Sequence, residues 1–253
     1  MDKVFIGIIP ARYGSTRLEG KPLLDICGKS MIQRVYEQAI EALDDVFVAT
    51  DDERIKKAVE DFGGKAIMTA ETHITGTNRC LEAAQKIKFE YGLDFDVILN
   101  IQGDEPLLDI GQIKDLINCY KDETPEMATL VIPVSDPQDL SNQSEVFVTL
   151  DIYGNALYFS RAVIPYLRDV PREDWVKSHT FYKHLGMYAY TLDALKRFSS
   201  LAQSPLEKLE GLEQNRWLEN GYNIKVGITR FESIPVDTQE DLDRVRKIIQ
   251  EKK

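Results

Sequence analysis

The chain has 253 residues, of which 43% are hydrophobic and 29% are charged, an ordinary composition for a folded globular protein. The formal net charge is −11 and no run of five Lys or Arg occurs, which argues against nucleic-acid binding through a broad basic face. No apolar run approaches the roughly 18 residues of a membrane-spanning helix, so membrane insertion is not expected. An acidic protein that binds an anionic ligand must gather positive charge in one place.

The three cysteines, Cys27, Cys80 and Cys119, are scattered and form no C-x-x-C pair. This spacing disfavours a zinc site or a disulfide framework and is typical of a reducing compartment. An apolar strand begins directly after the first three residues, without the small-residue cleavage site of a signal peptide. We therefore expect a cytoplasmic protein.

The first 134 residues alternate between short apolar runs and segments with helical spacing. Residues 4–9 (VFIGII) are typical of a buried parallel strand. Further strands are predicted at residues 46–50, 65–68, 97–101 and 127–134. Helices are predicted between the strands, at residues 31–43, 52–62, 77–88 and 109–120. This alternation indicates a Rossmann-like parallel sheet with helices on both faces and right-handed crossovers.

The alternation stops after Pro133. Residues 145–150 and 156–160 flank D-I-Y-G-N and are predicted to form a hairpin, and residues 184–190 form another strand. We interpret residues 135–190 as an antiparallel insert, suited to dimerisation or to closing over a substrate, set in an α/β domain of residues 1–134 plus 191–253, the two forming one continuous structural unit. The rest of that domain is predicted as a helix at 205–220, a strand at 224–228 and a helix at 240–251.

The loop at residues 10–22 (PARYGSTRLEGKP) carries the local positive charge that an acidic protein needs for a triphosphate. It contains Arg12, Arg17 and Lys21 with two glycines and two hydroxyls, at the carboxyl end of a parallel strand, where open α/β sheets bind ligands. A solvated basic loop is the alternative interpretation. The sequence has neither G-x-x-x-x-G-K-[ST] nor G-x-G-x-x-G here, which argues against a nicotinamide-dependent oxidoreductase.

Two carboxylates follow predicted strands at the same edge of the sheet. Asp104 comes after residues 97–101 in N-I-Q-G-D-E-P, where Gly103 permits a tight turn, and Asp237 follows another apolar segment. Together they could hold Mg²⁺ against phosphate oxygens. Helix capping is the alternative for each, and it is strong for Asp237 in V-D-T-Q-E-D-L.

The segment I-I-P-A-R-Y-G-S-T-R-L-E-G-K-P-L resembles the opening signature of the 3-deoxy-manno-octulosonate (Kdo) cytidylyltransferases. The related acylneuraminate cytidylyltransferases share I-P-A-R-x-G-S-x-R but usually continue with K-N. The resemblance extends along nearly the whole chain in ordered blocks, which include V-A-T-D-D (48–52), Q-G-D-E-P (102–106), A-L-Y-F-S-R (156–161), H-L-G (184–186), S-P-L-E (204–207) and V-D-T (236–238).

This resemblance implies a fold of the nucleotide-diphospho-sugar transferase type and a Mg²⁺-dependent nucleotidyltransferase. The implied reaction is attack of the anomeric hydroxyl of Kdo on the α-phosphorus of CTP, giving CMP-Kdo and pyrophosphate, by a homodimer. The implied catalytic residues are Arg12, Lys21, Asp104 and Asp237, the last two holding the metal. The nucleotide-binding set is Ala11, Arg12, Ser15, Lys21, Asp51, Thr75, Gly76, Thr77 and Gln102.

The sugar-binding set that the resemblance implies is Arg161, His184, Glu213 and Gln214. A bidentate Arg suits a carboxylate. Tyr188 joins this set because residues i and i+4 share a face of a strand, although core packing is an alternative for it. Glu207 and Glu210 share the helical spacing of Glu213, and we interpret both as a solvated face.

The sequence departs from the family pattern at two informative positions. The family usually shows H-x-S-G-T-[DE]-R where this chain has Thr75 and Asn78, and often shows Val-Lys where this chain has Val146-Phe147. These departures motivate an alternative acidic sugar, such as 8-amino-Kdo or a neuraminate. A non-catalytic nucleotide-binding protein is a further alternative.

Overall fold

The computed structural model describes residues 3–14, 18–142, 144–232 and 234–251. The chain divides into two compact units, unit 1 with residues 1–114 and 232–253, and unit 2 with residues 115–231. The chain passes from unit 1 to unit 2 within helix α4 (Ile110–Asn118). Of the helices in the described ranges, none combines the length and apolar character needed to cross a membrane.

Unit 1 contains a parallel sheet in the order β6-β1-β4-β5. Its strands are β1 (Phe5–Ala11), β4 (Asp45–Thr50), β5 (Ala66–Met68) and β6 (Val97–Asn100). The register pairs Ile8 with Asn100 and Ala11 with Thr50. Strands β1, β4 and β6 are buried along nearly their whole length, as expected for a parallel sheet covered on both faces. Their carboxyl ends therefore meet at one edge.

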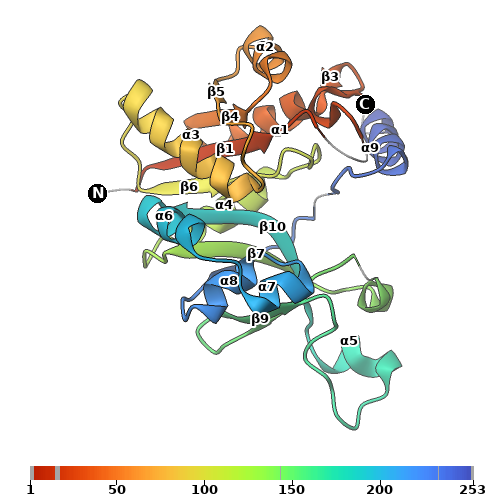
Figure 1. Ribbon diagram of the computed structural model, residues 1–253. Coiled ribbons are helices and arrows are strands. Elements are labelled where there is room, and N and C mark those ends of the chain that lie inside the picture. The colour runs from red at the N-terminus through yellow and green to blue at the C-terminus, as the bar shows by residue number, and fades with distance from the viewer. Residues whose placement is uncertain (1–2, 15–17, 143, 233, 252–253) are drawn as a thin grey trace. The chain divides into compact units, whose positions relative to one another are not determined.

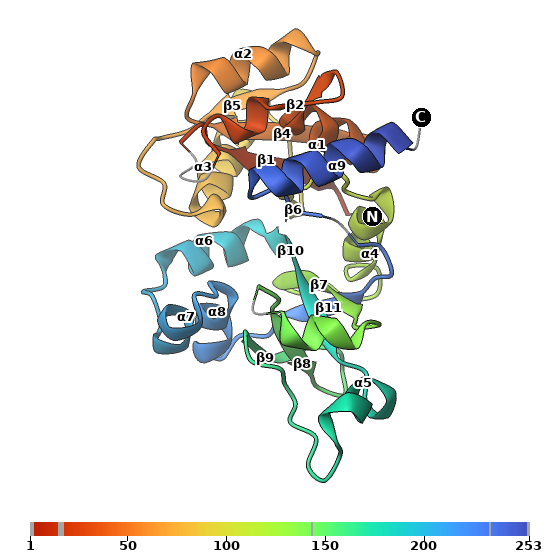
Figure 2. The same ribbon diagram turned by 90° about the vertical axis from the view of Figure 1, so that its right-hand side faces the viewer.

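The helices of unit 1 connect these strands by crossovers. They are α1 (Met31–Ala39), α2 (Glu53–Asp61) and α3 (Gly76–Glu90). The chain runs from β1 through β4 to β5 and then returns past β1 to β6, so right-handed crossovers place α1 and α3 on opposite faces, as Figures 1 and 2 show. Each helix begins after a residue with a capping oxygen, and these N-caps are Ser30, Asp52 and Thr75.

The C-terminal helix α9 (Gln239–Glu251) also belongs to unit 1. It lies beside the short hairpin of β2 (Asp25–Ile26) and β3 (Lys29–Ser30), as Figure 2 shows. Its buried side chains form one apolar cluster with the hairpin and the start of α1; the cluster contains Ile26, Met31, Val236, Leu242, Val245 and Ile249. This cluster attaches the segment around Val236 to the N-terminal part of the unit.

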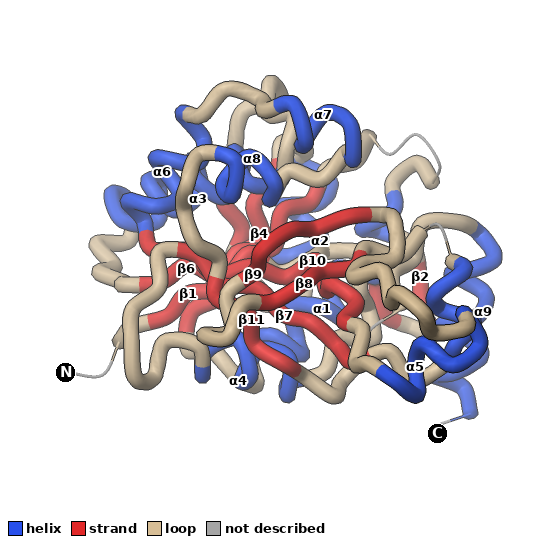
Figure 3. The backbone as a smooth tube through the Cα atoms, turned by 90° about the horizontal axis from the view of Figure 1, so that it is seen from below, coloured by secondary structure: helices blue, strands red, loops and turns tan. Residues whose placement is uncertain are grey.

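Unit 2 is built on a mixed sheet. Strand β7 (Met127–Pro133) pairs in parallel with β11 (Lys225–Ile228) and antiparallel with β10 (Tyr182–Thr191), which pairs in turn with β8 (Phe147–Leu150). Strand β9 (Ala156–Ser160) pairs antiparallel with β8, and Figure 3 shows these strands in red. The register of β10 against β7 shifts between Leu185 and Tyr188, which marks a bulge at Gly186 and Met187.

The helices of unit 2 are α5 (Trp175–Ser178), α6 (Leu192–Ser200), α7 (Pro205–Glu210) and α8 (Gln214–Glu219). The prediction of a single helix over residues 205–220 is wrong, because α7 ends at Gly211, which has a left-handed φ of 65°. Glycine adopts this conformation without the steric cost of a Cβ, so it ends the helix there. The break allows α8 to start in a new direction at Gln214.

The predicted α/β fold with a mostly parallel sheet and an antiparallel portion is confirmed. The predicted strands appear with ends displaced by at most two residues, and the hairpin at D-I-Y-G-N is present as β8 and β9. Within the described residues, the short 3-10 helices, the β2–β3 hairpin, α5 and α6 were not predicted. Helix α6 follows β10 directly, with Thr191 as its N-cap.

Candidate functional site

Two glycines allow neighbouring segments to pack against Pro10 near the end of β1. A Cβ on Gly103 would lie 3.0 Å from the carbonyl oxygen of Pro10, and a Cβ on Gly76 would lie 3.3 Å from its ring Cγ. A Cβ at 3.0 Å from a backbone oxygen is too close to be tolerated without movement. The glycines thus bring the loop after β6 and the start of α3 to the end of β1. The predicted nucleotide-binding residues Ala11, Gly76 and Gln102 meet at this corner of unit 1.

The loop after β1 folds back on itself before Lys21. The Gly20 amide donates a hydrogen bond to the carbonyl of Tyr13 (3.1 Å), and Gly20 has a left-handed φ of 65°. Lys21 then opens a short 3-10 helix (Lys21–Leu23). Arg12 is exposed on this loop, whereas Ser15, predicted as a phosphate ligand, lies outside the described residues. Arg12 is therefore exposed to solvent. The hydrogen bond between Gly20 and Tyr13 fixes the point at which Lys21 begins the 3-10 helix.

The ammonium of Lys21 lies between the two carboxylates predicted to hold a metal. Its Nζ is 2.8 Å from Oδ2 of Asp104 and 3.0 Å from Oδ1 of Asp237. The lysine side chain is 13% exposed, and the two carboxylates are 31% and 39% exposed. Residues separated by 83 and 216 positions in the sequence thus form one charge cluster, which solvent can still reach.

Neither carboxylate of this cluster is needed as a helix cap. Helix α4 is preceded by Asp109, whose side chain accepts a hydrogen bond from the Gly111 amide (2.7 Å). Helix α9 is capped by Thr238 and Asp241, because the Thr238 hydroxyl accepts from the Asp241 amide (3.2 Å) and the Asp241 carboxylate accepts from the Thr238 amide (2.8 Å). The capping alternative for Asp104 and Asp237 is therefore not what the structure contains.

Asp237 is held beside Asp104 by its neighbours in the chain. The amide of Val236, a fully buried residue, donates to the Asp104 carbonyl (2.9 Å). On the other side, the Asp237 amide donates to the Asp241 carboxylate (3.1 Å). Burial alone would raise the pKa of Asp241, but the hydrogen bonds from Thr238 and Asp237 outweigh it and keep the pKa below its ordinary value. Asp241 is therefore an anionic anchor for this segment at neutral pH.

Replacing Thr238 with alanine tests this capping arrangement. We expect a free energy of unfolding lower by about 1 kcal/mol, the usual cost of losing an N-cap hydroxyl. Thr238→Ser keeps the hydroxyl and is the matched control, so it should stay within about 0.5 kcal/mol of the native protein. Urea unfolding measures both variants. Equal stability of the alanine and serine variants would contradict the role of the hydroxyl.

The remaining predicted nucleotide ligands of unit 1 have structural partners. Asp51, directly after β4, forms an ion pair with Arg79, whose buried guanidinium also donates to the Thr69 hydroxyl. Thr75 is the N-cap of α3, its hydroxyl accepting from the Asn78 amide (3.3 Å). Thr77 is buried within the first turn. Arg79 was not among the predicted residues, and it orients Asp51 at the strand end.

The predicted sugar ligands lie in unit 2. Arg161 follows β9, is exposed, and is tied to Glu210 at the end of α7: its amide donates to Oε2 of Glu210 (3.0 Å) and its Nε donates to the Glu210 carbonyl (2.9 Å). The hydroxyls of Ser160 (2.7 Å) and Tyr158 (3.1 Å) donate to the same carboxylate. The prediction that Glu210 belongs to a solvated face is wrong, because its carboxylate accepts hydrogen bonds from residues at and just after the end of β9.

His184 and Tyr188 share a face of β10, as the i, i+4 spacing predicts. Their ring centroids are 5.3 Å apart, and the His184 ring also meets the edge of Phe159 at 5.0 Å. Burial lowers the pKa of His184 to about 3, so the ring is uncharged at neutral pH. Burial, and then the charge of Glu213, raises the pKa of Tyr188 well above its ordinary value. The structure thus brings His184, Tyr188 and Glu213 together.

The start of α8, which carries Glu213 and Gln214, is fixed by residues that the sequence analysis missed. The side-chain Nδ2 of the fully buried Asn215 donates to the Phe159 carbonyl (2.9 Å), and the Phe159 backbone amide donates to Oδ1 of Asn215 (3.3 Å). Arg216 forms a buried ion pair with Glu207, and the exposed fractions of both side chains are 7%. The prediction that Glu207 is solvated is therefore also wrong. The helical spacing of the glutamates does not reveal that residues of α8 bury this side chain.

Phe147 does not present its side chain to solvent as a replacement for a binding lysine. It is 1% exposed and packs in an apolar cluster with Val134, Leu140, Trp175 and Phe181. In the register of the sheet it lies opposite Lys183, whose ammonium contacts the Asp139 carboxylate (2.9 Å). The departure at position 147 is therefore a change of core packing in unit 2.

Phe147→Lys tests this interpretation. We expect the free energy of unfolding to fall by about 3 kcal/mol or more, because an aromatic core side chain is lost and a charge enters an apolar cluster. Ser144→Lys, at an exposed position nearby, is the control and should change stability by less than about 0.5 kcal/mol. Urea unfolding gives the stability of both. A stable Phe147→Lys protein with a changed sugar preference would contradict the core role.

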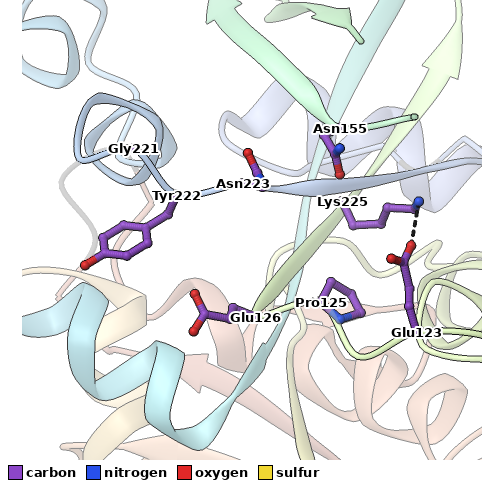
Figure 4. Close-up of a pocket in the computed structure, with 8 residues that line it drawn as sticks. All are labelled: Glu123, Pro125, Glu126, Asn155, Gly221, Tyr222, Asn223 and Lys225. Atoms are coloured by element: carbon purple, nitrogen blue, oxygen red, sulfur yellow. Dashed lines mark ion pairs between the residues drawn. The ribbon is translucent and has the colours of Figure 1, made fainter. Parts of the chain in front are cut away.

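A polar hollow of about 350 Å³ lies elsewhere in unit 2. Figure 4 shows its lining by Glu123, Pro125, Glu126, Asn155, Gly221, Tyr222, Asn223 and Lys225. The ammonium of Lys225 is paired with Oε1 of Glu123 (2.6 Å) and also donates to the Tyr153 carbonyl (3.0 Å). None of the lining residues is among those predicted for nucleotide or sugar binding.

Comparisons with known proteins place this chain among the cytidylyltransferases. Residues 6–234 match the family model described as cytidylyltransferase. A 3-deoxy-manno-octulosonate cytidylyltransferase of Bacteroides thetaiotaomicron is 52% identical over 97% of this chain and 98% of its own. One of Parabacteroides distasonis is 53% identical over 95% of this chain and 96% of its own.

A solved structure gives the same result at the level of the fold. The structure of a CMP:2-keto-3-deoxy-manno-octonic acid synthetase complexed with CTP has a TM-score of 0.89 and 40% sequence identity to this chain, and covers 99% of it and 100% of its own chain. The chain belongs to the family of 3-deoxy-manno-octulosonate cytidylyltransferases.

Proposed function

We propose that this protein transfers CMP from CTP to 3-deoxy-manno-octulosonate and releases pyrophosphate. The observation that carries the proposal is the charge cluster in which Lys21 Nζ lies within 3.0 Å of both Asp104 and Asp237, at the strand-end corner where the glycine-containing loop after β1 begins. A triphosphate needs cations and backbone amides at such a strand end. Family membership supplies the substrate class.

The reaction exchanges the α–β phosphoanhydride bond of CTP for a phosphodiester bond to the sugar. The oxygen of the anomeric hydroxyl of the sugar bonds to the α-phosphorus of CTP, and the bond from that phosphorus to the bridging oxygen of the β-phosphate breaks. The hydroxyl proton passes to solvent and pyrophosphate leaves. Positioning and charge neutralisation carry catalysis in phosphoryl transfer. In this proposal Arg12 and Lys21 neutralise the charge that develops on the leaving pyrophosphate.

Asp104 and Asp237 are the residues proposed to hold Mg²⁺. Their carboxylates converge on a single point, now marked by the Lys21 ammonium, and both are partly exposed. Among the described ranges of the chain, no group of three or more His, Cys, Asp and Glu side chains gathers to hold a metal ion. Two carboxylates with phosphate oxygens and water suit Mg²⁺, which seldom has an all-protein site. When bound, Mg²⁺ supplies further neutralisation of phosphate charge.

The residues of unit 2 are proposed to bind the acidic sugar. Arg161 carries a guanidinium fixed through its Nε and amide, which suits a carboxylate. His184, Tyr188, Glu213 and Gln214 offer hydrogen-bonding groups suited to sugar hydroxyls. An 8-amino-Kdo or a neuraminate remains the second candidate substrate, and the observation that favours it is Asn78 in place of the family's acidic residue, half-buried in the first turn of α3.

We also propose a cytoplasmic homodimer. In the described residues none of the three cysteines forms a disulfide, which suits a reducing compartment. The β8–β9 hairpin exposes Ile152 (91%), Tyr153 (73%) and Leu157 (60%), and exposed apolar side chains of this kind suit a protein contact. Sedimentation equilibrium at micromolar concentration tests the oligomeric state; a monomer throughout would exclude the dimer.

Pyrophosphate release tests the proposed function. Purified protein is incubated with CTP and Mg²⁺, and Kdo, 8-amino-Kdo and N-acetylneuraminate are offered separately, with a no-sugar control and a second series containing EDTA. The expected result is release with Kdo that EDTA abolishes. Release only with another acidic sugar would keep the chemistry and change the substrate. No release with any sugar would contradict catalysis and favour a nucleotide-binding protein.

A further inference from the structure

The hydroxyl of Thr129, a fully buried residue of β7, occupies the bulge of β10 beside His184. Its Oγ1 is 2.8 Å from the Met187 carbonyl oxygen, 3.4 Å from the Leu185 carbonyl oxygen and 3.0 Å from Nε2 of His184. Gly186 and Met187 are the two extra residues of the bulge. One hydroxyl therefore joins both ends of the bulge to the imidazole ring.

The partners of the Thr129 hydroxyl determine which of them receives its proton in a hydrogen bond. A carbonyl oxygen can only accept, so the hydroxyl donates to Met187, its nearest partner. The lone pair of Oγ1 is then directed to His184, and the ring nitrogen facing it must carry a hydrogen. Nε2 of His184 is accordingly the N–H, and Nδ1 is the unprotonated nitrogen. The low pKa of the ring, caused by burial, agrees with a single ring proton.

The other ring nitrogen is available to a ligand. Across the described residues, His184 has no hydrogen-bond partner for Nδ1, and its side chain is half-buried between the rings of Phe159 and Tyr188. An uncharged nitrogen with a lone pair accepts a hydrogen bond from a hydroxyl and does not attract a carboxylate. The carboxylate of an acidic sugar is thus left to a cation such as Arg161.

We propose that Thr129 is a positioning residue that fixes His184 as its Nε2–H tautomer, so that Nδ1 accepts a hydrogen bond from a hydroxyl of the acidic sugar. This inference rests on the proposed function for the identity of the ligand. It goes beyond that function because it assigns a direction to the hydrogen bond and a role to a residue that does not touch the sugar. Thr129 acts only through His184 and the bulge.

The first test reads the tautomer directly in the full-length protein. The chain has three histidines, so a long-range ¹H–¹⁵N spectrum of ¹⁵N-histidine-labelled protein resolves each ring, and a His184→Gln sample assigns its signals. We expect His184 to show the Nε2–H pattern at pH 7. The Nδ1–H pattern in the native protein would overturn the inference, whatever the protein's activity.

The second test separates positioning from folding. Thr129→Val should give a mixed tautomer signal and raise the KM for the sugar roughly three- to tenfold, the effect of one neutral hydrogen bond, with the KM for CTP changed less than about twofold. Thr129→Ser should restore both. Thr229→Val removes another buried hydroxyl, one that accepts from the Phe231 amide, and should leave both KM values unchanged.

The outcomes distinguish this inference from the proposed function. If wild-type protein releases no pyrophosphate with any acidic sugar, the proposed function fails while the tautomer remains measurable. If wild-type protein is active but Thr129→Val keeps the native tautomer and the native KM for the sugar, the inference fails and the function stands. Should Thr129→Val not fold, Thr129→Ser and the native spectrum still decide, because a serine variant with a mixed tautomer contradicts the role of the hydroxyl.

Discussion

Replacing Asp104 with asparagine is expected to lower kcat/KM for pyrophosphate release by at least about 100-fold, the size of effect seen when one preorganised charge-stabilising group is removed. Asparagine keeps the shape of the side chain and leaves intact the main-chain hydrogen bond from Val236. It removes one of the two negative charges that face Lys21 and that are proposed to hold Mg²⁺. The measurement is steady-state pyrophosphate release with saturating Mg²⁺.

The controls for this experiment separate charge from fold. Asp243→Asn, at an exposed position on α9, should change kcat/KM by less than about twofold and stability by less than about 0.5 kcal/mol. CTP binding by Asp104→Asn, followed by calorimetry without sugar, should be retained because Arg12 and Lys21 remain. Unchanged turnover in Asp104→Asn would remove the charge cluster from the proposed mechanism.

Replacing Arg216 with methionine is expected to lower the free energy of unfolding by about 3–5 kcal/mol, the usual cost of breaking a buried ion pair from one side. The variant leaves the Glu207 carboxylate uncompensated at an exposed fraction of 7%. The same carboxylate accepts from the Ser204 amide (3.1 Å) at the start of α7. Urea unfolding at pH 7.5 measures the effect, and Lys57→Met, from the exposed Lys57–Asp61 pair, is the control with an expected change below about 1 kcal/mol.

The stability lost in Arg216→Met should depend on pH, whereas a simple loss of packing would not. Burial alone would raise the pKa of Glu207, but in the native protein the hydrogen bonds of Arg216 and Ser204 outweigh burial and hold the pKa below its ordinary value. The native pair therefore stabilises the fold above the ordinary carboxyl pKa, and this stabilisation is lost as the pH falls through the lowered value.

In Arg216→Met the burial that remains raises the pKa of Glu207, so protonation favours the folded state of the variant as the pH falls. The difference in stability between native protein and variant should thus narrow between pH 7.5 and pH 5. The double variant Arg216→Met, Glu207→Gln should be more stable than Arg216→Met alone at pH 7.5. A constant difference across this pH range would show that Glu207 carries no uncompensated charge.

The local pattern of the sequence was sufficient to predict most strands and helices of this fold. Apolar runs such as residues 4–9 and capping residues such as Asp52 act on neighbours a few positions away, and their effect is visible in one dimension. The break of the expected helix at residues 205–220 depended on a single glycine. Gly211 is tolerated within a helix at a modest cost, so only packing decides whether it ends one.

The sequence was less informative about which polar side chains are buried. Glu207, Glu210, Asn215 and Arg216 have the composition of a solvated helix, yet they join α7, α8 and β9 by hydrogen bonds and an ion pair. Thr129 is one residue of an apolar strand and gains its role only from the bulge that faces it. Apart from the Glu207–Arg216 pair, these contacts link residues 50 to 58 positions apart and leave no periodicity to find.

The choice between capping and binding at Asp237 shows a second limit of the sequence. V-D-T-Q-E-D-L offers Asp237 and Thr238 as adjacent N-cap candidates, and propensity favours both residue types. The structure decides for Thr238 because Asp241, three residues later, completes a reciprocal cap with it. The spacing T-x-x-D was present in the sequence and could have identified the cap before the structure was known.

The hydrogen bond between Val236 and Asp104 has a consequence for how the protein is made. A ribosome builds residues from the N-terminus onward, so Asp104 and Lys21 have left the exit tunnel long before Asp237 is added. All of unit 2 is synthesised in between, and closing so long a loop is a slow, non-local step. A nascent chain that has completed the strands of unit 1 still lacks one carboxylate of the charge cluster and the apolar cover that α9 gives to Ile26 and Met31. Enzymatic competence would then arrive as one event, only after the segment from Val236 through α9 has been added.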